Sequence, residues 1–189
     1  HGIGTKGKFI KSPNDLTDLT IRSQPSIVHP LTWSTFGAVP IALETSEVVD
    51  ALESAKIVAY GNTPLFVFAA GWQPYITHFT QTKHLYQPGV IAFGKSWFDK
   101  QTPEHKKVLN GRSHEGALEG RTGVRKIQPD LLENFRSFGI KVYKLTPAER
   151  KQFAKKAQQV RKSYEGKASP GAVLLLKAIE KGKVAFKKK

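Results

Sequence analysis

Short apolar segments of strand length recur along the first third of the chain, and their spacing limits the possible fold more than any other feature. They lie at 20–24, 39–43 and 57–60, and the segments between them have helical periodicity. Strand and helix in turn, at the spacing of βαβ units, predict a mainly parallel sheet with helices packed on it. Pro40 cannot donate a hydrogen bond to a ladder, so it predicts an edge position for strand 39–43. The sequence therefore indicates the α/β class.

The rest of the chain predicts further helices and strands. The segment 86–93 is expected to be a strand, and Thr102-Pro103-Glu104 is a capping signature that opens a long helix. Glycines at 111, 116, 120 and 123 predict a kink or break in that helix, and Pro129 predicts its restart. The last expected elements are a strand at 141–145 and two helices opened by Thr146-Pro147 and Ser169-Pro170.

Positive charge is concentrated at the C-terminal end. The 189 residues carry 30 Lys and Arg against 15 Asp and Glu, a formal net charge of +15, and residues 141–189 hold 15 basic against 3 acidic residues. A helix with Phe153, Ala157, Val160 and Tyr164 on one stripe can dock on its own protein, so its lysines are expected to form a solvated face. Aromatic residues are not interleaved with the lysines, which disfavours nucleic acid as a partner.

Catalytic and membrane signatures are missing from the sequence. There is no cysteine, HExxH, Walker loop or GxGxxG, and the six histidines are scattered without ligand spacing. No apolar run is long enough to span a bilayer, and the start of the chain predicts that a signal peptide is absent or already removed. These observations predict a protein that is not an enzyme, needs no cofactor and is not inserted in a membrane.

Arg22 lies close to the end of the first predicted strand, where it could hold an anion. A guanidinium at the end of a buried strand presents a rigid fork that pairs bidentately with a carboxylate, although Arg22 alone also fits a surface or salt-bridged arginine. Gln24 shares the face of Arg22 by strand alternation and could line the same cleft. The amide of Asn62 could donate to a carboxylate or accept from a hydroxyl, or it could cap the helix that begins at Pro64.

A series of short motifs is spaced along residues 13–84. It consists of Pro13-Asn14-Asp15-Leu16-Thr17-Asp18-Leu19-Thr20-Ile21-Arg22, Gly37-Ala38-Val39-Pro40, Ser46-Glu47 with Ala51-Leu52, Asn62 with Pro64, and His84. At these distances the series resembles the second half of the solute-binding proteins of TRAP transporters, whose best-known members capture carboxylates outside the inner membrane. In that family the arginine that closes the unit DLxGLxxR grips the ligand carboxylate, and Arg22 matches it, with Asp18 in place of the glycine.

The resemblance also implies roles for other residues. Asn62 matches a ligand-binding asparagine, and Thr45 falls where family members place a side chain against the ligand, although it could only cap a helix. Some relatives hold a cation with a carboxylate that Gly61 replaces here, so no bound metal is expected. His84 matches a histidine at the start of the family's interlobe strand and is interpreted as a packing residue.

The resemblance implies a periplasmic-binding-protein-like fold of class II type, with a mixed, mainly parallel sheet, a long helix, and a first lobe that is largely missing. Residues 1–84 would form the second lobe, 85–140 the interlobe strand and long helix, and 141–189 a basic strand and helices packing on the lobes. The implied function is capture of a small organic carboxylate in the periplasm, a dicarboxylate, keto or hydroxy acid or sugar acid, and its delivery to TRAP membrane subunits. The alternative is a basic interaction module that binds polyanions such as nucleic acid through 141–189.

Overall fold

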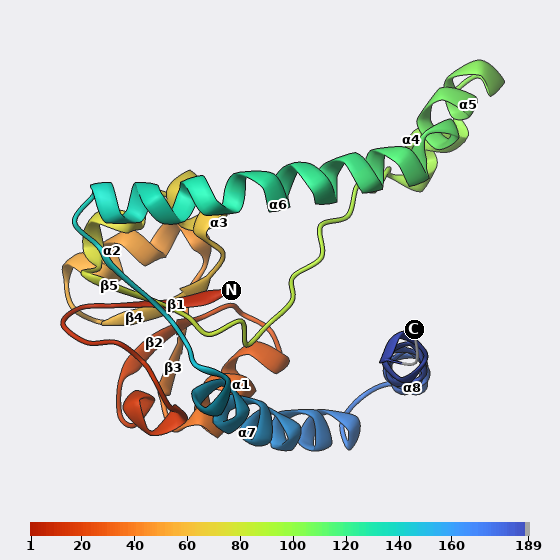
Figure 1. Ribbon diagram of the computed structural model, residues 1–189. Coiled ribbons are helices and arrows are strands. Elements are labelled where there is room, and N and C mark those ends of the chain that lie inside the picture. Colours follow the sequence, from red (N-terminus) through yellow and green to blue (C-terminus); the bar gives the residue numbers. More distant parts are fainter. Residues whose placement is uncertain (188–189) are drawn as a thin grey trace.

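A six-stranded sheet lies at the centre of the computed structural model, which describes residues 1–187 (Figure 1). Its strands are β1 (Gly2–Thr5), β2 (Thr20–Ser23), β3 (Val39–Ala42), β4 (Ala59–Asn62), β5 (His78–Gln81) and β6 (Lys141–Lys144). The order is β3-β2-β4-β1-β5-β6, so β3 and β6 are the edges. β2 is parallel to β3 and β4, β5 is parallel to β6, and β1 is antiparallel to both neighbours. The α/β class, the mixed sheet and the edge position of the strand with Pro40 are confirmed. Residues 188 and 189 of the predicted basic segment lie outside the described residues.

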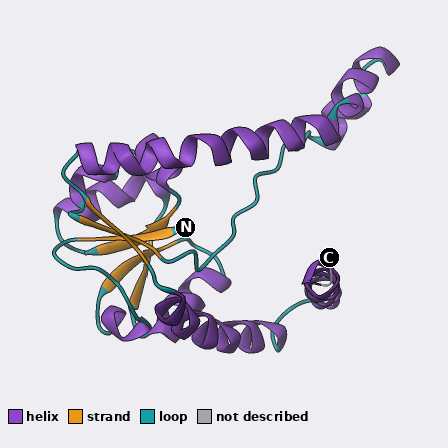
Figure 2. Cartoon of the chain, in the orientation of Figure 1, coloured by secondary structure: helices purple, strands orange, loops and turns teal. Residues whose placement is uncertain are grey.

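Helices cover both faces of the sheet (Figure 2). The helices of the described chain are α1 (Val28–Phe36), α2 (Val48–Glu53), α3 (Pro64–Ala69), α4 (Lys95–Asp99), α5 (Pro103–Gly111), α6 (Ser113–Ser137), α7 (Pro147–Glu165) and α8 (Pro170–Lys187), with 3₁₀ turns at Pro13–Leu16, Thr45–Glu47 and Gln73–Tyr75. Figure 1 shows α2, α3 and α6 on one face and α1 and α7 on the other. The described chain therefore has three layers, helix, sheet and helix.

Two apolar clusters fill the spaces between these layers. Under α6, the ring of Phe135 lies 4.8 Å from that of Phe68 and 4.7 Å from that of Phe79, measured between centroids. On the opposite face, Phe36 of α1 meets Phe153 of α7 edge to face at 5.6 Å. The prediction that α7 docks on its own protein is confirmed, because Phe153 and Val160 are buried.

The segment between β5 and β6 departs from the sequence-based expectation. Residues 82–94 form no strand, so the predicted strand at 86–93 is wrong for this structure. A strand needs a partner for its backbone groups, and this segment finds none in the sheet. The predicted break is confirmed where α5 ends at Gly111, but α6 then continues through Pro129. Proline removes one helical hydrogen bond, and packing of Phe135 further along α6 holds the helix in place.

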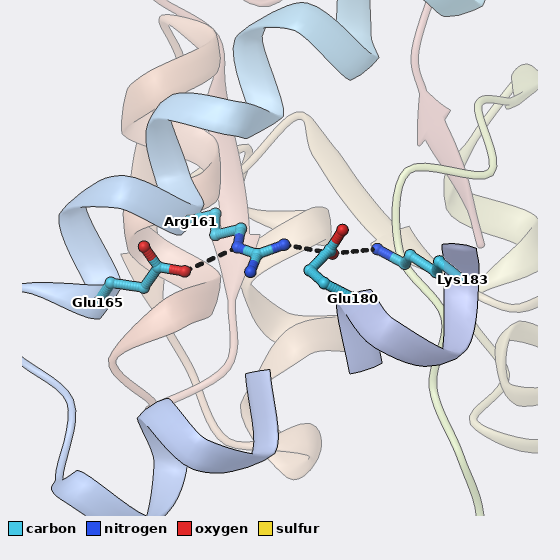
Figure 3. A network of polar contacts seen from close by, with 4 residues as sticks. All are labelled: Arg161, Glu165, Glu180 and Lys183. Atoms are coloured by element: carbon cyan, nitrogen blue, oxygen red, sulfur yellow. Dashed lines mark hydrogen bonds and ion pairs between the residues drawn. The ribbon is translucent and has the colours of Figure 1, made fainter. Parts of the chain in front are cut away.

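The helix α8 stands apart from the sheet and is linked to α7 by ion pairs (Figures 1 and 3). Arg161 of α7 pairs with Glu165, at 2.8 Å, and with Glu180 of α8, which also accepts from Lys183 at 2.9 Å. All four side chains are partly or largely exposed, so these pairs contribute little to stability. No helix in residues 1–187 combines the length and apolar character needed to cross a membrane.

Candidate functional site

The predicted binding residues lie at or just beyond the carboxyl ends of three neighbouring strands, β2, β3 and β4. β2 is parallel to β3 and β4, with Arg22 opposite Ile41 on one side and Tyr60 on the other. The carboxyl ends of these strands therefore lie next to one another. This border of the sheet, formed by strand ends and not by the outer strands β3 and β6, is called the carboxyl edge below. The chain passes from β2 to β3 on one side and then back across β2 to β4, and such switch points in open α/β sheets are where ligands bind.

Arg22 is buried at this edge with only 3% of its surface exposed. Its Nε donates to the carbonyl oxygen of Leu43 at 3.2 Å, and its guanidinium lies over the ring of Trp72, 5.5 Å from the centroid. It joins no ion pair within residues 1–187, so the predicted alternative of a surface or salt-bridged arginine does not describe it. Burial lowers the pKa of Arg22, and the nearby Glu44 carboxylate partly opposes that change. Arginine still stays charged in proteins, so the site holds a buried cation without a paired carboxylate.

Asn62 ends β4 and is 1% exposed. Its Oδ1 accepts from the backbone N–H of Thr63 at 2.8 Å, which leaves the amide NH₂ group as its donor toward a ligand. The cap of α3 is supplied instead by Thr63, whose hydroxyl accepts from the N–H of Phe66 at 3.2 Å. The alternative prediction that Asn62 caps this helix is therefore wrong.

Gln24 and Thr45 lie just beyond β2 and β3. Gln24 is half-buried one residue past the end of β2, two positions from Arg22. Thr45 is exposed in the turn Thr45–Glu47, whose N-cap is Glu44, so the alternative that Thr45 caps the helix is wrong. The carboxylate of Glu47 accepts from the N–H of Glu44 at 2.7 Å, and this bond closes the start of the turn.

Two tryptophans border the edge from opposite faces of the sheet. Trp72, fully buried, lies under Arg22 and also contacts Tyr60, with ring centroids 5.2 Å apart. Trp33 is equally buried and packs against His84 at 5.1 Å. The contact between Arg22 and Trp72 was not predictable from spacing, because it depends on how the turn after α3 folds back to the sheet.

His84 is a packing residue in this structure. Its Nδ1 lies 2.5 Å from the hydroxyl oxygen of Thr82, and the ring fits between Trp33 and His1. Burial, with lesser contributions from the positive N-terminus and His29, lowers the pKa of His84 to about 3. The imidazole is therefore neutral at physiological pH. Within residues 1–187 no three His, Asp or Glu side chains gather closely enough to hold a metal ion.

Comparison with known proteins gives the family of the chain. Residues 3–167 match the model of the bacterial extracellular solute-binding protein family 7. The chain belongs to this family, which comprises solute-binding proteins of transport systems and not enzymes.

It is 29% identical over 172 residues to the 2,3-diketo-L-gulonate-binding periplasmic protein YiaO of Escherichia coli, covering 90% of this chain and 52% of the relative. It is 22% identical to the C4-dicarboxylate-binding protein DctB of Bacillus subtilis, covering 86% of this chain and 47% of the relative. The chain thus spans about half the length of these relatives.

Solved structures of TRAP periplasmic binding proteins share the fold. The ectoine-binding protein of the TeaABC transporter of Halomonas elongata superposes with a TM-score of 0.84 at 18% identity, over 94% of this chain and 58% of that one. A solute-binding protein of Citrobacter koseri with bound D-glucuronate gives 0.79 at 25% identity, over 95% and 57%. The predicted TRAP-type periplasmic binding fold is confirmed, and the chain corresponds to part of it.

Proposed function

We propose that this chain carries the carboxylate-binding half of a periplasmic TRAP solute-binding protein, with Arg22 as the residue that grips the acid. The observation that carries the proposal is the buried, unpaired guanidinium at the carboxyl edge of the sheet. A buried cation is costly without a counter-ion, and an organic carboxylate would supply one through two parallel hydrogen bonds. Similar proteins that bind diketogulonate, C4-dicarboxylates and glucuronate support an acid as the ligand class.

Asn62 and Gln24 would complete the site on either side of the arginine. The NH₂ group of Asn62 can donate to a second carboxylate oxygen or to a hydroxyl, and Gln24 is half-buried two positions after Arg22, just past the end of β2. Thr45 would contact the ligand from beyond β3. The loaded protein would deliver its ligand to TRAP membrane subunits at the periplasmic face of the inner membrane.

Substitution of Arg22 tests this proposal directly. We expect Arg22→Ala to abolish binding of glucuronate, diketogulonate and succinate, and Arg22→Lys to weaken it by about tenfold or more, because lysine keeps the charge but loses the fork. Isothermal calorimetry and NMR shift perturbation on the full chain measure this. Arg136→Ala removes an exposed arginine and is the matched control. Unchanged affinity in Arg22→Ala would contradict the proposal.

A second candidate function is polyanion binding through the basic region 141–189. Lys144, Arg150 and Lys151 line a hollow of about 500 Å³ at the start of α7, which favours an anionic partner there. This function predicts polyanion binding that falls steeply with salt and is lost in the triple variant Lys144→Gln, Arg150→Gln, Lys151→Gln. Heparin retention that is equal in this variant and the native chain would exclude this hollow as the binding surface.

A further inference from the structure

His29, the second residue of α1, is a buried histidine that the proposed site does not yet use. Only 5% of its surface is exposed. Its Nδ1 lies 2.9 Å from the backbone nitrogen of Gln24, 3.3 Å from the indole nitrogen of Trp33 and 3.2 Å from the hydroxyl oxygen of Ser23. A backbone N–H and an indole N–H can only donate, so Nδ1 is the acceptor that both of them share.

This arrangement determines the protonation of the ring. Because Nδ1 accepts, it carries no proton, and the neutral imidazole must have its proton on Nε2. Nε2 is buried and has no hydrogen-bond partner among residues 1–187. Burial, aided by the charge of Arg22 on β2, lowers the pKa of His29 to about 4, and the neighbouring His84 is itself neutral. The imidazole therefore keeps its acceptor throughout the pH range in which the protein would work.

The hydrogen bond from Gln24 ties the end of β2 to the start of α1. β2 ends at Ser23, so the N–H of Gln24 lies beyond the strand, and His29 supplies the acceptor that the sheet does not. Side chains alternate along β2, so Ser23 contacts His29 on the α1 face while Arg22 projects to the opposite face, where its guanidinium lies over Trp72. Fixing the backbone of residues 23 and 24 thus fixes the direction of the two candidate ligand-binding side chains on either side of Ser23.

We propose that His29 is a positioning residue for the carboxylate site, and that its Nδ1 clamps the carboxyl end of β2 so that Arg22 and Gln24 meet the ligand in one orientation. This inference rests on the proposed function. His29 need not touch the ligand. Its contribution is the conformation of the strand end from which the guanidinium projects.

Two substitutions of His29 distinguish the role of Nδ1 from that of Nε2. In asparagine, Oδ1 stands at the position of Nδ1, so His29→Asn keeps the acceptor for Gln24 and removes the Nε2 donor. In glutamine, the terminal amide reaches the position of Nε2, so His29→Gln keeps a polar group there and removes the acceptor. We expect His29→Asn to bind glucuronate within about threefold of the native chain, and His29→Gln to bind it roughly tenfold or more weakly.

Two measurements on the full chain make the test independent of ligand identity. Hydrogen exchange of the Gln24 amide should stay slow in His29→Asn and become fast in His29→Gln, while amides of β4 exchange equally in both. The ¹⁵N shift of Nδ1 in the native chain should be that of an unprotonated acceptor. Equal affinities for the two variants, or slow exchange of Gln24 in His29→Gln, would overturn the role of His29. Absence of carboxylate binding in the native chain would instead overturn the proposed function, whatever the exchange data.

Discussion

At the scale of single residues, the site depends on groups whose usual partners are missing or unusual. Arg22 is buried beside an indole and a carbonyl oxygen, and it has no carboxylate partner among residues 1–187. The Nδ1 of His29 accepts from the backbone N–H of Gln24, which lies beyond the strand, and from the indole N–H of Trp33. Arg22 lies near the end of β2, and His29 accepts a hydrogen bond from the residue that follows this strand. Substitutions at these two residues should therefore alter ligand affinity more than the free energy of unfolding.

Gly61 is a position near the candidate site where one added methyl group should be costly. A Cβ atom there would lie 2.5 Å from the ring of Trp33, which is fully buried and cannot move freely. We expect Gly61→Ala to lower the free energy of unfolding by about 1 to 3 kcal/mol through overpacking. Urea denaturation measures this change.

Gly116→Ala is the matched control for that substitution. This glycine lies in α6, and a Cβ atom there would meet no atom within 4 Å. Alanine has the higher helix propensity, so the variant should gain roughly 0.5 to 1 kcal/mol. A loss at Gly116 equal to that at Gly61 would contradict the packing explanation.

Two buried histidines should make stability depend on pH. The folded-state pKa values of His29 and His84 are about 4 and about 3, below the ordinary value of 6.5. Between these values the unfolded chain binds more protons than the folded one. The free energy of unfolding should therefore be highest above pH 6.5 and fall as pH drops toward 4. Urea denaturation at pH 7, 6 and 5 measures the slope. The double variant His29→Asn, His84→Asn should flatten it, and an unchanged slope would show that other groups are responsible.

At the scale of secondary structure, α7 is held by one aromatic contact more than by its charges. Phe153 is 2% exposed and meets Phe36 of α1. Phe153→Ala should therefore lower the free energy of unfolding by about 3 to 5 kcal/mol. Phe186→Ala, at a side chain 80% exposed on α8, should change it by less than about 0.5 kcal/mol. Similar midpoints for the two variants in urea would contradict this account of how α7 docks.

Most elements that carry their own start and stop signals were predictable from the sequence. Periodicity and caps indicated β2, β3 and β4 with the helices between them, and Thr146-Pro147 marked the start of α7. β1 and β5 were not predicted, because Gly2–Thr5 and His78–Gln81 have weak local strand patterns and depend on pairing with each other and with β4. The segment 86–93 shows the reverse case, a strand-like composition without a partner strand.

The candidate site was predictable only where it depends on strand ends. Arg22 and Gln24 lie in the last part of one predicted parallel strand and Asn62 follows another, and such strands place their carboxyl ends together. His29 and Trp72 were not predicted as parts of the site. Their contacts depend on how α1 and the turn after α3 pack against that edge, and no spacing in the sequence records this.

At the scale of the whole molecule, most of the exposed large apolar side chains lie outside the layered part of the chain. Of the twenty large apolar residues exposed in the described chain, nine lie in residues 85–127 and five in α8. The segment from residue 85 to the outer part of α6 extends past the sheet in Figure 1. This segment should therefore open more easily than the layered part.

Limited proteolysis tests this difference. Tyr86 and Trp97 are 75% and 50% exposed, whereas Trp33 and Trp72 are fully buried. Chymotrypsin should cut first within residues 86–98, leaving the strands β1 to β5 intact, as intact mass spectrometry would show. First cuts at Trp33 or Trp72 would mean that the layered part opens as readily as the extension.

The two outermost strands of the sheet also bear on how the chain behaves in a crowded compartment. An unpaired strand edge can recruit a strand from another molecule and start aggregation. Here β3 and β6 have four residues each, Pro40 removes one donor from β3, and β6 begins and ends with lysine. Short length, a missing donor and repelling charge all hinder the addition of a further strand. The chain can thus present an open α/β sheet without offering its flanks as a template for fibrils.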